Sequence, residues 1–90
     1  MYRVRKTVSF DKDFKKLDGI ITQRVIEKIR YLAANPVAAK KVRYLPEDLS
    51  GLMKYRVGDW RILFWIDHAK KEIILYGVDH RGGIYKKLGR

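Results

Sequence analysis

Apolar and polar positions alternate most clearly in the second half of the chain, where the pattern predicts three strands joined by two tight turns. The strands are Met53–Val57, Trp60–Asp67 and Glu72–Asp79, with turns at Gly58-Asp59 and at His68-Ala69-Lys70-Lys71. A two-residue turn that starts with glycine suits an antiparallel hairpin. The run Ile73-Ile74-Leu75-Tyr76 is apolar on both faces, so we expect the third strand to be central in its sheet.

The first part of the chain predicts a short strand and then a helix. Alternation over Tyr2–Val8 predicts the strand, and its positive charge suits a sheet edge, where it discourages pairing between molecules. Apolar side chains then recur at helical spacing at Phe10, Phe14 and Leu17. Ser9 or Asp11 is suited to cap this helix at its N-terminus.

A second helix is predicted from Ile20 to Ala34, with an apolar stripe on one side and charged residues on the other. Asp18-Gly19 separates the two helices, and Asn35-Pro36 ends the second one. The region Val37–Ser50 reads mainly as loop. We therefore expect one α+β domain over residues 1–90: an antiparallel sheet of about four strands, with an N-terminal two-helix hairpin packed on one face.

Composition narrows the class of protein. Ninety residues with 47% hydrophobic content are enough for one small core. The chain has no cysteine, which excludes disulfides and thiolate metal sites, and two histidines alone do not make a zinc site, so we expect no metal and no cofactor. No segment approaches the ~18 apolar residues of a membrane span, and the start lacks a signal-peptide pattern, so we expect a cytoplasmic protein without a membrane partner.

The charge balance points to an anionic partner. Lysine and arginine number 21 against 10 acidic residues, which gives a formal net charge of +11. A polyanion offsets the self-repulsion of such a chain, and nucleic acid is the leading candidate because binding it releases condensed counterions. A lysine-rich solvated surface without any ligand is the alternative.

The predicted meander gathers cations and a tyrosine on one surface. Period two places Lys54 and Arg56 on the same face of the first hairpin strand, and Arg61 falls close to them across the turn. The segment after the last strand adds further groups close to this surface. The candidate site residues are Lys54, Arg56, Arg61, Arg81 and Tyr85, with His80 as a candidate for proton transfer.

These side chains match what RNA cleavage without a metal requires. A base must activate the 2′-hydroxyl, cations must stabilise the charged phosphorane, and an acid must protonate the departing 5′-oxygen. Lysine serves as a base when neighbouring cations and desolvation disfavour its charged form. Arginine makes bidentate phosphate contacts, and tyrosine stacks on an unpaired base or donates a proton.

Each candidate on the hairpin also has a structural interpretation. Lys54 and Arg56 can be ordinary strand residues that face solvent. Arg61 can form an ion pair with Asp59 or Asp67, which lie on the same hairpin. Spacing alone does not separate these interpretations from a binding site.

The same holds for the residues near the end of the chain and for the other ring side chains. Arg81 can simply end a strand, Tyr85 can be a core residue, and His80 can be a hydrogen-bonded structural group. His68 lies in a charged turn, and we expect no role for it. Trp65 lies on the opposite side of its strand from the predicted core residues Trp60, Ile62, Phe64 and Ile66.

The order of several motifs resembles the RelE/ParE toxin superfamily over nearly the whole chain. The first is the helical hairpin SFDKDFKKLDGIITQRVIEKIRYL, followed by the loop Leu49-Ser50-Gly51-Leu52. The most specific is Gly58-Asp59-Trp60-Arg61-Ile62-Leu63-Phe64, and the last is His80-Arg81 followed by Tyr85. Each fragment is weak alone, and their order and spacing together are fairly specific.

The resemblance implies a RelE-like fold and the toxin of a type II toxin–antitoxin system, a ribosome-dependent endoribonuclease that cuts mRNA in the A site and inhibits translation. It implies base and charge-stabilising roles for Lys54 and Arg56, phosphate contacts for Arg61 and Arg81, and base stacking for Tyr85. It also implies a cognate antitoxin, RelB-like and acidic, and a complex with the ribosome and mRNA.

Two other functions fit the same family. A ParE-like toxin shares the fold, inhibits DNA gyrase and has no nuclease activity. A catalytically inactive member would be a basic module that binds only RNA or its antitoxin. The lysine, arginine and tyrosine positions retained here favour the RelE-like function.

Overall fold

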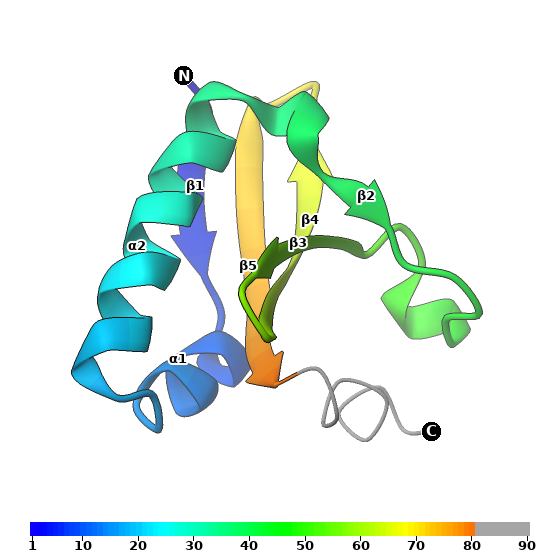
Figure 1. Cartoon of the computed structure of the whole chain (residues 1–90). Helices are drawn as coiled ribbons and strands as arrows, with labels where there is room; N and C mark the ends of the chain where they lie inside the picture. Colours follow the sequence, from blue (N-terminus) through cyan, green and yellow to red (C-terminus); the bar gives the residue numbers. More distant parts are fainter. Residues whose placement is uncertain (81–90) are drawn as a thin grey trace.

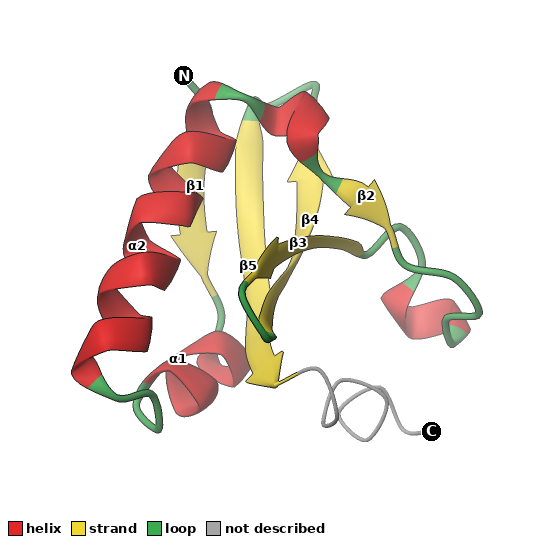
Figure 2. Cartoon of the chain, in the orientation of Figure 1, coloured by secondary structure: helices red, strands yellow, loops and turns green. Residues whose placement is uncertain are grey.

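Two helices cover one face of a five-stranded sheet in the computed structural model, which describes residues 1–80 (Figures 1 and 2). The sheet has the order β1-β5-β4-β3-β2; β1 is parallel to β5, and the other neighbours are antiparallel. The strands are β1 (Arg3–Lys6), β2 (Lys40–Lys41), β3 (Met53–Val57), β4 (Trp60–Asp67) and β5 (Glu72–His80). The helices are α1 (Val8–Phe14) and α2 (Gly19–Ala34), with short 3₁₀ turns η1 (Pro36–Ala38) and η2 (Glu47–Leu49). This is the α+β class predicted from the sequence.

The strand predictions hold in the hairpins and miss one short strand. The ranges predicted for β3 and β4 are those observed, and β5 extends one residue further, to His80. Gly58 has φ +63°, which the first central residue of this tight hairpin turn requires. The sheet has five strands within residues 1–80 instead of about four, because the Lys40–Lys41 segment pairs with β3. Two residues are too few to show an alternating pattern.

The first helix begins earlier than its apolar spacing indicates. Its N-cap is Thr7, so the predicted caps Ser9 and Asp11 are wrong. The Thr7 Oγ1 atom accepts a hydrogen bond from the Phe10 backbone N–H and donates one to the Leu75 carbonyl. The apolar spacing from Phe10 does not define where the helix begins, and Thr7 is favoured as the cap by this additional bond to β5. The helix ends at Phe14.

The main core lies between the helices and the sheet, as predicted. Phe10, Val25 and Leu32 from the helices pack with Ile62, Phe64, Ile73 and Leu75 from β4 and β5, and all of them are almost fully buried. Trp60 and Ile66 are partly buried against this cluster. The predicted central position of β5 is confirmed, because it lies between β1 and β4.

A second, smaller cluster covers part of the opposite face of the sheet. Leu49, Leu52 and Leu63 are buried there, with Trp65 and Tyr76 packed against them. The Trp65 indole N–H donates to the Ser50 carbonyl over 3.1 Å. A register shift leaves Tyr76 as an extra residue of β5 opposite the junction of Leu63 and Phe64, and its ring meets Trp65 edge-on at 5.2 Å. Trp65 is therefore a packing residue that holds the 42–52 segment on the sheet.

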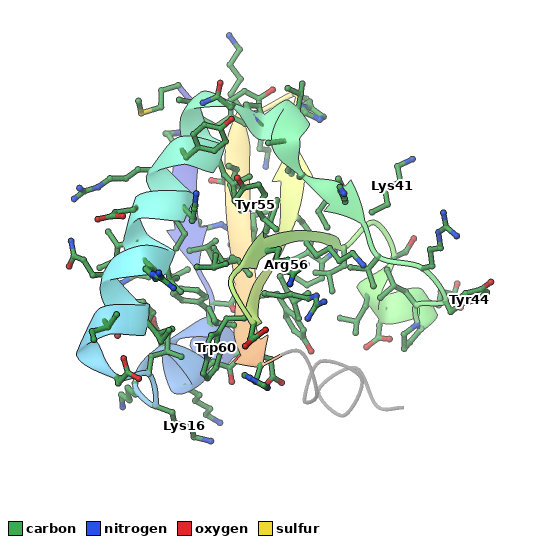
Figure 3. All side chains as sticks on the ribbon, viewed as in Figure 1. Lys16, Lys41, Tyr44, Tyr55, Arg56 and Trp60 are labelled. Atoms are coloured by element: carbon green, nitrogen blue, oxygen red, sulfur yellow. The ribbon has the colours of Figure 1, made fainter. Side chains whose placement is uncertain are left out.

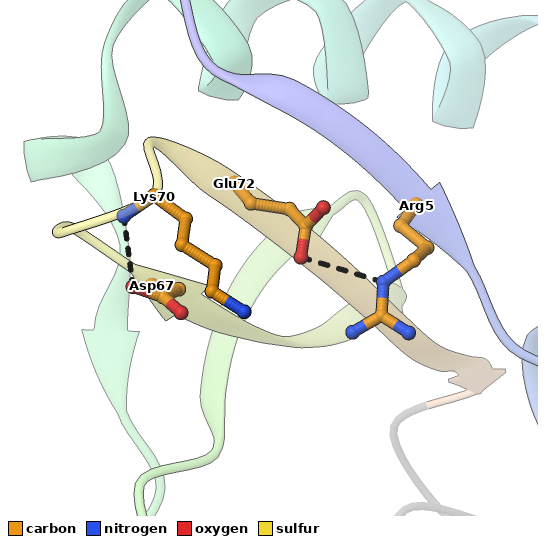
Figure 4. Close-up of polar contacts among 4 residues, drawn as sticks. All are labelled: Arg5, Asp67, Lys70 and Glu72. Atoms are coloured by element: carbon orange, nitrogen blue, oxygen red, sulfur yellow. Dashed lines mark hydrogen bonds and ion pairs between the residues drawn. The ribbon is translucent and has the colours of Figure 1, made fainter.

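Polar contacts fix the turn between β4 and β5 and attach the edge strand β1 to β5 (Figure 4). The Arg5 Nε atom lies 3.4 Å from a Glu72 carboxylate oxygen, across the parallel β1–β5 pair. An Asp67 carboxylate oxygen accepts a hydrogen bond from the Lys70 backbone N–H over 3.0 Å. No helix within residues 1–80 is long and apolar enough to cross a bilayer.

Candidate anion-binding site

Strand register places like charges opposite one another on the sheet face that carries no helix. Arg56 of β3 pairs with Arg61 of β4, and Lys54 of β3 pairs with Lys40 of β2. Like charges in directly opposite positions destabilise a sheet. The predicted convergence of Lys54, Arg56 and Arg61 is therefore present, and it extends to a fourth cation. An anion held between these side chains offsets their mutual repulsion.

These cations line a cavity of about 420 Å³, within the size range of small-ligand sites. We call it the β3 cavity; it is lined by Ala38, Lys40, Lys54, Tyr55, Arg56 and Arg61. It lies where β2 ends and the remainder of β3 has no neighbouring strand on that side. Tyr55 and Arg56 follow one another along β3 in Figure 3. The lining includes no carboxylate, so the cavity suits an anion.

The Arg61 guanidinium has a buried nitrogen without a partner. Its Nη1 atom is buried and makes no hydrogen bond within residues 1–80. Neither Asp59 nor Asp67 pairs with it there; Asp67 accepts from Lys70 instead (Figure 4). Asp79 lies opposite Arg61 in the sheet, yet its carboxylate accepts from the adjacent His80 N–H. An unsatisfied buried donor costs about 1–3 kcal/mol, which a bound phosphate oxygen would recover.

The Arg56 side chain is tied to the hairpin turn. Its Nε–H donates to the Gly58 carbonyl over 2.8 Å. This bond fixes the direction of an otherwise exposed side chain beside the β3–β4 turn. A guanidinium held in place loses less conformational entropy when it binds a phosphate.

The two histidines lie away from the β3 cavity. The His80 ring packs edge-on against Trp60, with ring centroids 5.4 Å apart, on the face that carries the helices. It is not among the residues that line the cavity. His68 shares a 2.7 Å hydrogen bond with the Tyr2 hydroxyl, so it has a structural role in the turn. Arg81 and Tyr85, the other two candidates, lie outside the described residues.

Lys40 is the site residue that sequence reasoning missed. It lies in the region Val37–Ser50, where the group of basic residues Lys40, Lys41 and Arg43 is its only signal. Within residues 1–80, no group of three or more histidine and acidic side chains is placed to hold a metal ion. The chemistry that the described site offers is the binding of a phosphate or a similar anion by converging cations beside one tyrosine.

Comparison with known proteins identifies the family and agrees with this fold. Residues 4–85 match the family described as the ParE toxin of the type II toxin–antitoxin system parDE. A curated relative, Toxin RelG of Mycobacterium tuberculosis, is 32% identical over 87 residues, which cover 96% of this chain and 98% of that protein.

Comparison with solved structures also finds toxins of this fold. The toxin–antitoxin complex RelBE2 of Mycobacterium tuberculosis contains a chain with a TM-score of 0.77 and 32% identity, covering 89% of this chain and 98% of that one. The isolated RelE toxin of E. coli has a TM-score of 0.72 at 17% identity, covering 97% and 94%, and shows the shared fold. The chain therefore belongs to the RelE/ParE family of toxins of type II toxin–antitoxin systems.

Proposed function

We propose that this toxin is a ribosome-dependent endoribonuclease that cleaves mRNA in the A site. The proposal is supported by the two pairs of opposed like charges in the β3 cavity, together with the buried Nη1 atom of Arg61, which has no hydrogen-bond partner within residues 1–80. A scissile phosphate supplies the negative oxygens that these groups lack. Similarity to Toxin RelG supports the RelE-like activity over a simple binding role.

The cleavage step uses the RNA's own hydroxyl as the nucleophile. A base of the toxin removes the 2′-hydroxyl proton, the O2′–P bond forms, and the P–O5′ bond breaks as the O5′ atom takes a proton from an acid. The products are a 2′,3′-cyclic phosphate and a 5′-hydroxyl. Lys54 and Arg56 are proposed for the base and charge-stabilising roles, and Arg61 for stabilising the phosphorane.

The residues after β5 complete the proposed machinery. Arg81 is proposed as a further phosphate contact and Tyr85 as the residue that stacks on a base. His80 stays a prediction for proton transfer. Its ring would have to leave Trp60 to reach a phosphate in the β3 cavity.

A RelB-like antitoxin is the proposed protein partner. The similar toxin structures from Mycobacterium tuberculosis and E. coli include RelBE complexes. An acidic antitoxin segment would offset the +11 charge of this chain and would block the cationic face. We place the complex, the ribosome and the mRNA in the cytoplasm.

Cleavage of mRNA on programmed ribosomes tests the nuclease. The purified chain is added to ribosomes with a defined A-site codon, and new mRNA ends are mapped by primer extension. Arg61→Ala and Arg81→Ala are each expected to reduce the cleavage rate by about 10²–10³-fold, as for other removed transition-state donors. Arg3→Ala removes an exposed cation on β1 and should cut like wild type. Absence of new ends with the folded wild-type chain contradicts the proposal.

Gyrase inhibition is the second candidate, favoured by the match to the ParE toxin family. It predicts gyrase-dependent DNA breaks and a loss of supercoiling activity in vitro, with translation unaffected at first. The two assays together assign the activity, because the nuclease acts only on programmed ribosomes. A folded wild-type chain without effect in both assays would be an inactive binding module.

A further inference from the structure

A second basic hollow lies beside the β3 cavity, between α2 and the β3–β4 turn. It encloses about 530 Å³ and is lined by Arg24, Glu27, Lys28, Arg56, Val57 and Gly58. We call it the α2 groove. Arg56 lines both the α2 groove and the β3 cavity, so the two hollows meet at this side chain.

The α2 groove carries more positive charge than its own residues neutralise. Arg24 and Lys28 are four positions apart on α2, so they lie on the same side of the helix, where like charges repel. Glu27 is the one carboxylate in the lining, and within residues 1–80 it forms no ion pair with Arg24, Lys28 or Arg56. Three cations therefore face a shared hollow with one acidic group among them.

The hairpin turn brings two of these cations together. A Cβ atom on Gly58 would lie 3.7 Å from the Arg24 Nη1 atom, so the Arg24 guanidinium reaches over the turn. The Gly58 carbonyl also accepts the Arg56 Nε–H over 2.8 Å. Arg24 and Arg56 thus both approach Gly58, and Arg56 is held there by a hydrogen bond.

An aromatic pair connects the same two hollows. The Tyr31 ring of α2 stacks on the Tyr55 ring of β3, with centroids 6.1 Å apart and planes 28° from parallel. Tyr55 lines the β3 cavity, and the Lys28 ammonium lies 6.0 Å from the Tyr31 ring centroid. Tyr31 is 48% exposed, so this pair presents an aromatic surface next to both basic hollows.

We propose that the α2 groove binds backbone phosphate of RNA, with Arg24, Lys28 and Arg56 as its ligands. An RNA strand seated in the β3 cavity continues past Arg56, over the unpaired edge of β3, and into this groove. The inference rests on the proposed ribonuclease function and extends it by assigning the path of the flanking RNA. Cations that track a backbone beside an aromatic surface are typical of single-strand binding, and this favours RNA over an acidic peptide.

RNA length separates the two hollows in a binding experiment. Fluorescence anisotropy compares the full chain with Arg24→Ala/Lys28→Ala, using a labelled trinucleotide and an RNA of about twelve nucleotides. The double variant should bind the longer RNA at least about tenfold more weakly, and the slope of log affinity against log salt should fall by about 1.4, at ~0.7 per lost phosphate contact on a single strand. Binding of the trinucleotide should not change.

A matched control removes two other exposed cations from the helical layer. Lys16→Ala/Arg30→Ala makes the same change in net charge away from the α2 groove, and Figure 3 shows Lys16 far from Arg56. An equal loss of affinity in both double variants overturns the proposal, because the effect is then one of total charge. Unchanged affinity of the Arg24→Ala/Lys28→Ala variant for the longer RNA also overturns it.

An acidic peptide provides the competing outcome. If a glutamate-rich peptide binds the wild-type chain and is lost in Arg24→Ala/Lys28→Ala, while RNA binding is unchanged, then the groove is a protein site and the proposal is wrong. If the peptide binds the wild-type chain and the double variant equally, while the longer RNA binds the double variant more weakly, the proposal stands.

Crosslinking on the ribosome identifies the source of the phosphate. Because the chain has no cysteine, Glu27→Cys provides a single attachment point for a photo-crosslinker inside the α2 groove. A crosslink to mRNA or to ribosomal RNA supports the proposal and names the strand, whereas crosslinks confined to ribosomal proteins contradict it. If wild type cleaves mRNA and these tests fail, only the groove assignment is lost; if the tests succeed without any cleavage, only the nuclease assignment is lost.

Discussion

The two faces of the sheet differ in whether their charged and polar side chains have partners of opposite charge or hydrogen-bond partners. On the face covered by α1 and α2, the core side chains are apolar, and no polar or charged residue within residues 1–80 is buried as a whole. On the other face, a small leucine cluster covers one part, and the remainder carries opposed cations around the β3 cavity. The second face also contains the buried Arg61 Nη1 atom, which has no hydrogen-bond partner within residues 1–80.

Because of this difference, core residues and candidate site residues alternate along a single strand. Along β4, Ile62 and Phe64 belong to the main core, while Arg61 faces the β3 cavity. Successive residues of one strand therefore lie in different environments, and substitutions at neighbouring positions should have separable effects.

The largest effect is expected for Phe64→Ala on the helix-covered face. Phe64 is fully buried, and removal of its ring leaves a cavity in the main core, so the free energy of unfolding should fall by about 3–5 kcal/mol. Urea denaturation followed by circular dichroism measures this loss. Tyr44→Ala, at a position that is 83% exposed, should stay within ~0.5 kcal/mol of wild type. Equal losses at both positions would contradict the assignment of the core.

Arg61→Met tests the opposite face and should separate activity from stability. Cleavage on programmed ribosomes should fall by about 10²-fold or more, because the proposed hydrogen-bond donor to the phosphate is lost. The free energy of unfolding should stay the same or rise by up to about 1 kcal/mol, since a buried donor without a partner is removed. Parallel denaturation and cleavage assays measure both quantities. A destabilised but fully active variant would show that Arg61 is a structural residue.

Trp65→Phe should have an intermediate effect on stability alone. The change keeps a ring in the second cluster and removes the indole N–H that donates to the Ser50 carbonyl, which should cost about 1 kcal/mol. Hydrogen exchange should increase first in the 42–52 segment. Trp60→Phe is the matched control, because the Trp60 indole makes no hydrogen bond within residues 1–80. Unchanged exchange in the 42–52 segment would rule out this anchoring role.

The smallest effect is expected for Glu72→Gln at the β1 edge. The Arg5 side chain of this ion pair is 60% exposed, and exposed pairs contribute about 0.2–1 kcal/mol. Thermal unfolding at low and high salt should differ between wild type and variant by no more than about that amount. A loss above ~1 kcal/mol would mean that the pair is important for the attachment of β1 to β5.

The sequence predicts the features of this fold that depend on neighbouring residues. The β3–β4 hairpin has the expected limits because Gly58 sets the turn and alternation sets the faces, and these also place Lys54, Arg56 and Arg61 together. Lys40 was missed because its strand has two residues and is defined by its partner β3 alone. Thr7 was missed as a cap because its second bond goes to Leu75, at the other end of the chain.

The α2 groove depends on tertiary structure in the same way. Arg24 and Lys28 read as the solvated face of an amphipathic helix, and only the packing of α2 beside the β3–β4 turn brings them to Arg56. The roles of Arg81 and Tyr85 remain predictions that rest on sequence resemblance.

The position of β5 has a consequence for how a cell makes this toxin. β5 is the last of these five strands to be synthesised, yet it lies between β1 and β4 and supplies Ile73 and Leu75 to the main core. A nascent chain that lacks β5 cannot pair β1 or complete that core. The strands and helices that are synthesised earlier therefore reach their final packing only when β5 is present. The sheet is therefore completed only after β5 has been synthesised, and a product truncated before β5 cannot attach β1 to the remaining strands.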